Sequence, residues 1–205
     1  MKMRKWIIML LALMMLPGFI GRVEASPVVM LAGVQSRISK SAITMTEIDT
    51  GFQEMGQVVS ETLYAELAAN PKFTMVDNTE TARIARMDET ALINQLGNGQ
   101  INLELQKQAD YIILGFITNV SNIKAQSGVL GVGGKDGTVH VEISMRVMDA
   151  HTGALVFATT ANSRRKSELK YNVIVHRKDS GLGDALNNAL DIAAQNLAAQ
   201  FLEAV

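Results

Sequence analysis

The sequence predicts an α+β fold, in which a mixed β-sheet packs against helices and a long helix ends the chain. Three observations predict this class. Apolar residues recur at three- and four-residue steps over residues 52–67, as on one face of a helix. They alternate with polar residues over 138–149, as in a strand with one buried face. An Ala- and Leu-rich helical pattern runs from Gly181 to Val205.

The start of the chain has the pattern of a secretory signal peptide. After a basic start, the apolar run 6–16 is shorter than the ~20 residues that span a bilayer. Val23-Glu24-Ala25 then fits the cleavage rule of signal peptidase. We therefore expect residues 1–25 to be removed and residues 26–205 to form a single exported domain. An uncleaved membrane anchor is the alternative, because apolar residues resume shortly after the run.

The composition excludes several classes of function. The sequence contains no Cys, which excludes a thiol nucleophile, a thiolate metal site and lipid attachment at the signal junction. Beyond the expected signal peptide, Asp and Glu outnumber Lys and Arg. This acidic balance argues against a nucleic-acid partner, which would favour a basic surface.

Strands and helices alternate in the first half of the remaining chain. Residues 27–34 form an apolar run of strand length, and the Ser-rich stretch 36–42 predicts a loop. The helical pattern that starts at Thr46 stops at Asn70-Pro71, since the residue before a proline avoids helical geometry. A short strand is expected at residues 72–76.

Three short helices are expected before residue 109. Asp77 or Asn78 can cap the first, which would run through Met87, and Asp88 can cap the second. Residues 102–108 would form the third.

Strands dominate the part that follows. Residues 111–117 are nearly all apolar, as expected of a strand covered on both faces. The alternating strand 138–149 leads through a turn into an antiparallel partner at 154–161. Residues 169–175 alternate again and predict one more strand. The order of these elements is typical of an α+β sandwich.

No catalytic, cofactor-binding or metal-binding set emerges from the sequence. His140, His151 and His176 lie apart, and we interpret them as solvated surface residues. The Gly-rich stretch 128–137 lacks the spacing of a phosphate-binding loop and is interpreted as a hairpin tip. We therefore expect a protein without enzymatic activity or cofactor. A hydrolase that uses Asp or Glu remains a third class of function.

Two segments are candidates for contact with other molecules, because Gly-rich tips and basic clusters often make contacts. The alternative is that both are solvated hairpin ends. The basic cluster could bind anionic envelope material or an acidic partner. The candidate contact residues are Gly128, Gly131, Gly133, Gly134, Lys135, Arg164, Arg165 and Lys166.

Three stretches together resemble a known family. They are residues 59–77, which end in Asn70-Pro71-Lys72-Phe73-Thr74-Met75-Val76-Asp77, residues 109–117 and residues 141–156. In order and spacing they resemble the curli production assembly/transport component (CsgG) family. The resemblance implies a non-enzymatic envelope protein of a double-membraned bacterium, with protein partners, self-association and outer-membrane contact.

One branch of that family forms an outer-membrane channel for amyloid subunits, to which each subunit lends two hairpins. The corresponding segments here would be 119–142 and 157–176. The lipidated Cys of that branch is absent, and residues 163–168 are too polar for a membrane-crossing tip. We therefore expect a periplasmic binding or assembly module, associated with outer-membrane secretion or envelope biogenesis. The alternative is a subunit of a secretion channel for curli-like amyloid subunits.

Overall fold

The computed structural model describes residues 26–38, 52–124, 137–166, 170–172, 177–179 and 182–204. The expected signal peptide, residues 1–25, lies outside these ranges. The described elements are, in order, β1 (Val28–Ser36), α2 (Phe52–Ala68), β2 (Thr74–Val76), α3 (Asn78–Ala85), α4 (Glu89–Gly97), α5 (Leu103–Gln108), β3 (Tyr111–Lys124), β4 (Gly137–Asp149), β5 (Leu155–Lys166), β6 (Lys170–Asn172), β7 (Arg177–Asp179) and α6 (Leu182–Ala204). The predicted α+β class, with a mixed sheet and a long final helix, is confirmed.

The main sheet has five strands in the order β2-β1-β3-β4-β5. β1 pairs in parallel with β2 and β3, because helices connect these strands and return the chain to the same end. β3, β4 and β5 form an antiparallel meander. A separate two-stranded sheet pairs β6 with β7. The long antiparallel strands of the meander therefore make up most of the sheet.

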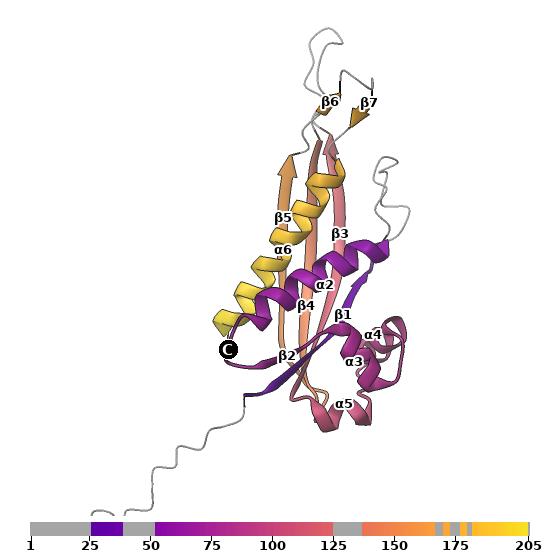
Figure 1. Cartoon of the computed structure of the whole chain (residues 1–205), viewed down its shortest axis with the longest axis vertical. Helices are drawn as coiled ribbons and strands as arrows, with labels where there is room; N and C mark the ends of the chain where they lie inside the picture. The colour runs from indigo at the N-terminus through magenta and orange to yellow at the C-terminus, as the bar shows by residue number, and fades with distance from the viewer. Residues whose placement is uncertain are drawn as a thin grey trace, which may run out of the picture.

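Helices cover the two faces of this sheet unequally (Figure 1). α2 and α6 pack together on one face, where α2 lies on β1 and α6 lies on β4 and β5. On the other face, α3 and α4 pack against β1. The larger hydrophobic core thus lies between the meander and the helix pair.

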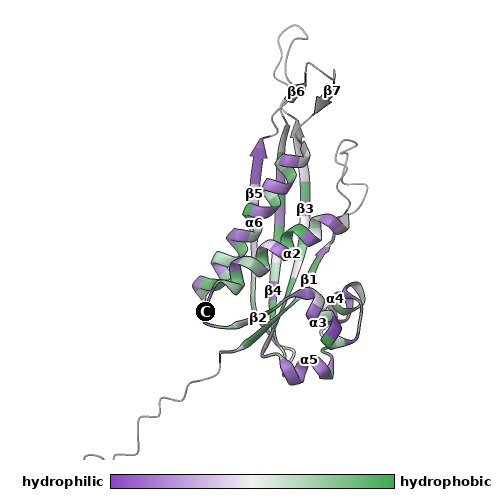
Figure 2. Cartoon of the chain, in the orientation of Figure 1, coloured by the Kyte–Doolittle hydropathy of each residue, from purple (hydrophilic) through white to green (hydrophobic). Residues whose placement is uncertain are grey.

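Both long helices present the apolar stripe that their sequences predict (Figure 2). The stripe of α2 comprises Met55, Val59, Leu63 and Leu67, all buried. On α6 the buried residues are Ala185, Leu186, Ala189, Leu190, Ala193, Ala194, Leu197, Ala198 and Phe201. The small Ala side chains on this stripe let α6 lie close to the sheet.

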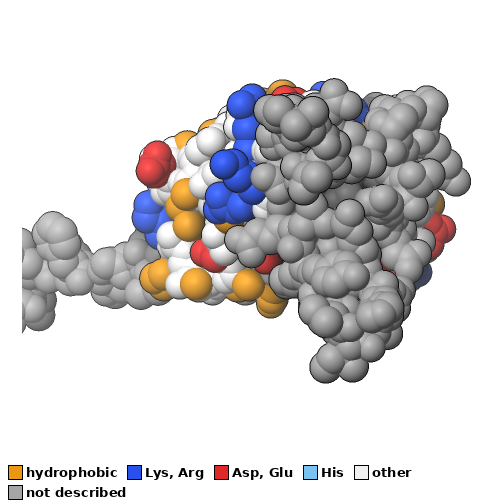
Figure 3. Space-filling view, turned by 90° about the horizontal axis from the view of Figure 1, so that it is seen from above, with side chains coloured by type: hydrophobic (Ala, Val, Ile, Leu, Met, Phe, Trp, Pro, Cys, Tyr) orange, Lys and Arg blue, Asp and Glu red, His pale blue; other side chains and the backbone are white. Residues whose placement is uncertain are grey.

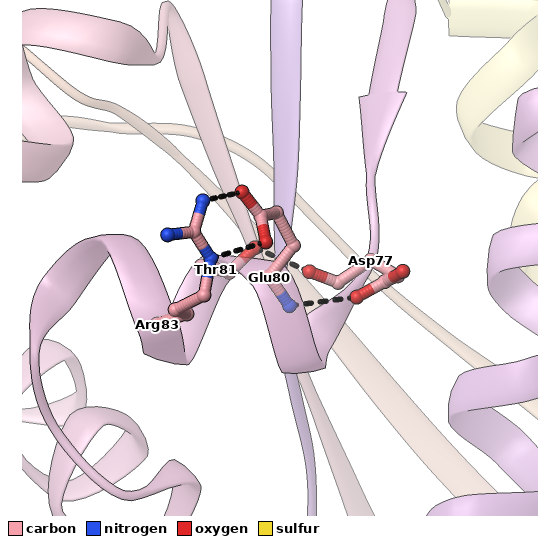
Figure 4. A network of polar contacts seen from close by, with 4 residues as sticks. All are labelled: Asp77, Glu80, Thr81 and Arg83. Atoms are coloured by element: carbon pink, nitrogen blue, oxygen red, sulfur yellow. Dashed lines mark hydrogen bonds and ion pairs between the residues drawn. The ribbon is translucent and has the colours of Figure 1, made fainter.

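The first short helix, α3, begins where the sequence predicts a cap (Figure 4). Asp77, rather than Asn78, is the capping residue, and its side chain accepts a 2.8 Å hydrogen bond from the backbone N–H of Glu80. Glu80 in turn forms an ion pair with Arg83. The helix ends at Ala85, before the expected Met87, because Arg86 adopts left-handed geometry with φ 56°. Asp88 caps α4 as predicted.

Several predicted strand boundaries differ from the structure. β1 continues to Ser36, the first residue of the expected loop, and β2 begins at Thr74. β3 continues past Ile117 to Lys124, and β5 continues past Ala161 to Lys166. Both extensions are polar, and pairing with β4 holds them, as in the partnership of Lys166 with Thr138. The expected strand 169–175 is represented by β6 alone, since residues 173–176 lie outside the described part.

The turn between β4 and β5 is built around the Asp149 carboxylate. Its Oδ1 atom accepts hydrogen bonds from the backbone N–H of Thr152 at 2.7 Å and of His151 at 3.0 Å. The Thr152 hydroxyl donates a third, at 2.9 Å. Gly153 completes the turn with φ 73°, a conformation that favours glycine. The Asp-x-x-Thr-Gly pattern is therefore a turn with a local structural cause.

We expect Asp149→Asn to lower the melting temperature by an amount that depends on pH. The hydrogen bonds, foremost that from the Thr152 backbone, hold the pKa of Asp149 below its usual value. A carboxyl whose pKa is depressed on folding stabilises the folded state above its unfolded pKa, and that contribution is lost as pH falls through the folded pKa. The melting temperatures of the Asp149→Asn protein and the unaltered protein should therefore differ at pH 7 and become equal in strong acid. An equal difference at every pH would contradict this assignment.

Candidate interaction surface

The meander has one buried face and one polar face. Alternate residues of β4 are buried in the core on the side of the sheet where α6 packs, namely Val139, Val141, Ile143, Met145 and Val147, as the sequence predicts. The intervening side chains point to the opposite side. Cross-strand partners extend this polar side onto β3 and β5, as in Ser121 with His140 and His140 with Arg164. We call this surface the open face, and it comprises Asn119, Ser121, His140, Glu142, Ser144, Arg146, Ala158, Thr160, Asn162, Arg164 and Lys166.

The open face is accessible. The residues of β5 on it are exposed, and those of β3 and β4 are half-buried except for Arg146, which is exposed. α6, the helix that packs along β4 and β5, lies on the opposite side of the sheet. In the described part of the chain, α3 and α4 reach the sheet at β1 and leave the open face uncovered.

Cations predominate on the open face. The face carries three cations, Arg146, Arg164 and Lys166, and one carboxylate, that of Glu142. The Oε1 atom of Glu142 accepts a 2.9 Å hydrogen bond from the Thr118 hydroxyl. None of the three cations forms an ion pair with another described residue. A surface with exposed, uncompensated cations favours an anionic partner.

A further cation, Arg37, follows the end of β1 and lies near Arg146 of the open face. The guanidinium of Arg37 stacks 3.6 Å from the ring centre of Phe116, and that of Arg146 lies 5.4 Å from the same centre. Burial lowers the pKa of Arg37, and the neighbouring charge of Arg146 lowers it further. The ring thus holds two like charges side by side, an arrangement that an anionic group would stabilise.

The predicted basic cluster lies at the end of β5. Figure 3 shows Lys and Arg side chains gathered on the side of the molecule that is seen from above. Arg164, Arg165 and Lys166 are all exposed. Arg164 and Lys166 belong to the open face, whereas Arg165 pairs with the buried Val139 and therefore points to the other side. The other candidate contact residues, Gly128, Gly131, Gly133, Gly134 and Lys135, lie outside the described part of the chain.

The histidines do not converge in the described structure. His140 is half-buried on the open face, opposite Arg164. His151 lies in the β4–β5 turn, exposed, with its Nε2 atom 3.8 Å from Oδ1 of Asp110. His176 lies outside the described residues.

β5 also exposes an edge. Among the described strands it pairs with β4 alone, so its outer N–H and C=O groups have no strand partner. Leu155 and Val156 at its start are 57% and 52% exposed. Such an edge can accept a further strand from another chain.

A polar groove of about 500 Å³ lies at the carboxyl end of β1. It is lined by Val34, Gln35, Ser36, Gln57, Ser60, Glu61, Asn78, Thr79, Glu89, Thr90 and Ile93. The Asn78 amide donates to Glu89 at 3.0 Å, and the buried Ser60 hydroxyl has no hydrogen-bond partner among the described residues. The lining offers hydrogen bonds from amides, hydroxyls and carboxylates. These residues come from four elements, β1, α2, α3 and α4, and no sequence pattern predicts that they lie together.

Two other kinds of feature are absent from the described residues. No group of His, Asp and Glu side chains there could hold a metal ion. None of the helices described is both long and apolar enough to cross a membrane.

The fold and the open face define an α+β domain that presents a polar, cationic sheet surface. The family model that matches the chain is "Flagellar assembly protein T, middle domain", over residues 48–175. This match covers more than half of the sequence, and the chain belongs to this family. No curated protein matches the chain.

Several solved structures are similar in fold. The hypothetical protein CT253 from Chlamydia trachomatis is 15% identical, with a TM-score of 0.49 over 86% of this chain and 96% of that one. Lipoprotein GNA1162 from Neisseria meningitidis is 13% identical, with a TM-score of 0.47 over 86% and 99%. The PelC dodecamer from Paraburkholderia phytofirmans is 13% identical, with a TM-score of 0.37 over 84% and 86%.

The family match corrects the resemblance to the CsgG family, which is wrong. The stretches that suggested it are β3 with the residues before it, the β4–β5 hairpin, and α2 with β2. Their apolar residues fill the core, and Asp149 and Gly153 shape a turn. Any sheet of this kind needs apolar core residues and turn residues, so these features did not distinguish one family from another.

Proposed function

We propose that this protein is an exported, non-enzymatic assembly module of the bacterial flagellum, which works by binding other proteins of the cell envelope. Membership of the flagellar assembly protein T family carries the proposal. The matched residues 48–175 include β3, β4 and β5, and therefore every residue of the open face. The surface that we regard as the binding site is thus part of the family's own domain.

The chemistry of the open face supports a binding role. Its exposed cations have no described ion-pair partners, and they lie on a sheet that pairing with β4 and packing on α6 keep rigid. A rigid surface loses little conformational freedom on binding, and unpaired cations steer an acidic partner into place. An acidic protein surface is therefore the partner that this face fits best.

We also propose that the protein is exported. Residues 1–25 have the pattern of a signal peptide, and residues 26–205 would then work as one domain in the periplasm.

Deleting the gene from its own bacterium tests the proposal. We expect cells without the protein to carry few or no flagella by electron microscopy and to lose swimming in soft agar, while growing at the normal rate. Cell fractionation should recover the protein from the periplasm or the envelope. Normal flagella on the deleted cells would contradict the flagellar role, and recovery of the protein from the cytoplasm would contradict export.

A further inference from the structure

The polar groove lies where the connections between the parallel strands change sides. β1 pairs in parallel with β2 on one side and β3 on the other. α2, which follows β1, packs on one face of the sheet, whereas α3 and α4, which follow β2, pack on the opposite face. In open sheets with parallel strands, ligands bind in the crevice that such a change leaves at the carboxyl ends. The groove occupies this position, and its volume of about 500 Å³ is within the range of small-molecule sites.

Two buried hydroxyls in the lining of the groove lack a hydrogen-bond partner. Ser60 on α2 is 2% exposed, and its Oγ atom forms no hydrogen bond with a described residue. The same holds for Oγ of Ser36 at the end of β1. A buried hydroxyl without a partner destabilises the folded state. A polar ligand that filled the groove would satisfy both groups.

The charged residues in the lining are both carboxylates, Glu61 and Glu89. Neither forms an ion pair within the described part of the chain. Glu89 is half-buried, and its Oε2 atom accepts the hydrogen bond from the Asn78 amide. β1 has a bulge at Gly33, where φ is 133°, and a Cβ atom there would overlap Oε1 of Glu89. Glycine therefore lets this carboxylate lie against the end of the strand, where it favours a cationic ligand.

Hydrogen-bond donors complete the lining. The first two residues of α3 and the first two of α4 belong to it. The capping side chains of Asp77 and Asp88 accept hydrogen bonds from the third backbone N–H of each helix. The first two N–H groups of each helix therefore remain donors without a partner inside the helix. Val34 and Ile93 add a small apolar area.

This combination of groups selects among ligands. The described residues contain no group of His, Asp and Glu side chains that could hold a metal ion. A sugar would leave the two carboxylates uncompensated, and a simple amine would leave the hydroxyls and the N–H donors unpaired. A peptide with a free N-terminus carries one positive charge together with N–H donors and C=O acceptors. Its chemistry therefore matches every part of the lining.

We propose that the groove binds the N-terminal end of a short peptide with small side chains, whose α-ammonium group pairs with the carboxylate of Glu89. The first-turn N–H groups of α3 and α4 donate to its carbonyl oxygens, and Ser36 and Ser60 hydrogen-bond with its backbone. This site goes beyond the binding role proposed for the open face, because the two surfaces share no residue. A free peptide and the N-terminus of another protein offer the same chemistry.

Isothermal titration of the purified protein with trialanine tests this inference. We expect binding with a Kd of about 1 mM or lower. N-acetyl-trialanine lacks the positive charge and should bind at least about tenfold more weakly, because a charge-assisted hydrogen bond is lost. Trialaninamide separates the two sources of the ligand. It should bind as well as trialanine if the natural ligand is the start of a longer chain, and about tenfold more weakly if it is a free tripeptide whose carboxylate also binds.

Two variants locate the site. Glu89→Gln should weaken trialanine binding about tenfold, whereas the matched change Glu104→Gln, also in the first turn of a short helix but outside the groove, should leave it unchanged. Ser60→Ala should weaken binding about fivefold, the effect of one hydrogen bond. It should not lower the melting temperature of the free protein, because the hydroxyl has no described partner to lose. A hydroxyl with a purely structural role would give the reverse pattern.

Four results would overturn the inference. The unaltered protein could fail to bind trialanine at about 10 mM. N-acetyl-trialanine could bind as tightly as trialanine. Propylamine could bind equally well, which would show that the groove takes any amine. The Glu89→Gln protein could keep its full affinity. These titrations use purified protein, so their failure is distinct from a normal flagellar count on the deleted cells.

Discussion

Replacing Leu197 by alanine is expected to lower the free energy of unfolding by about 2–5 kcal/mol, the usual cost of truncating a buried leucine. Leu197 is fully buried on the stripe of α6 that faces the meander. Its loss leaves a cavity where α6 meets the sheet. Urea unfolding should show a lower midpoint with an unchanged slope.

Asn196→Ala is the matched control, since Asn196 is the neighbouring residue and is exposed. It should leave the midpoint nearly unchanged. Comparing Leu197→Ala with Asn196→Ala also tests whether α6 belongs to the folded domain, because α6 lies beyond the residues 48–175 that match the family. Equal stability of the Leu197→Ala protein would show that α6 is not an integral part of the folded domain.

Gly56→Ala is expected to destabilise the protein by about 1–3 kcal/mol, although alanine is the better helix former. A Cβ atom at this position of α2 would lie 2.4 Å from the backbone oxygen of Val34 on β1. A backbone atom cannot rotate away, so the whole helix must move off the strand. Thermal or urea unfolding measures the loss.

Gly183→Ala is the matched control, and we expect it to have the opposite effect. Gly183 also lies in a helix, but among the described residues no atom beyond its chain neighbours and its own helix backbone is within 4 Å of where its Cβ would be. The substitution should be neutral or stabilising by up to about 1 kcal/mol. If Gly56→Ala were as stable as Gly183→Ala, the close approach of α2 to β1 would be wrong.

The sequence predicted the parts of the fold that have local causes. Helical periodicity places α2 and α6, and the caps at Asp77 and Asp88 depend on side chains within three residues. The strand β4 shows its two faces by alternation alone. These features follow from residues that are close in the chain, so sequence patterns capture them.

Features with distant causes were not predicted. The polar end of β3 is a strand because β4 pairs with it, as Ser121 does with His140. The alternation of β4 showed a polar face, but the absence of a helix over it follows from where α3 and α4 pack. The groove joins residues such as Ser60 and Glu89 from separate helices. Each depends on contacts between segments far apart in the chain.

The binding role of the open face is tested most directly by complementation of the deleted strain. The number of flagella per cell is counted after supplying the Arg164→Gln and Lys166→Gln protein or a control protein with Lys107→Gln, at matched protein levels. Lys107 lies on α5, outside the open face. We expect the open-face variant to leave cells with few flagella and the Lys107 variant to restore the normal number. Full restoration by the open-face variant would contradict the assignment of this surface.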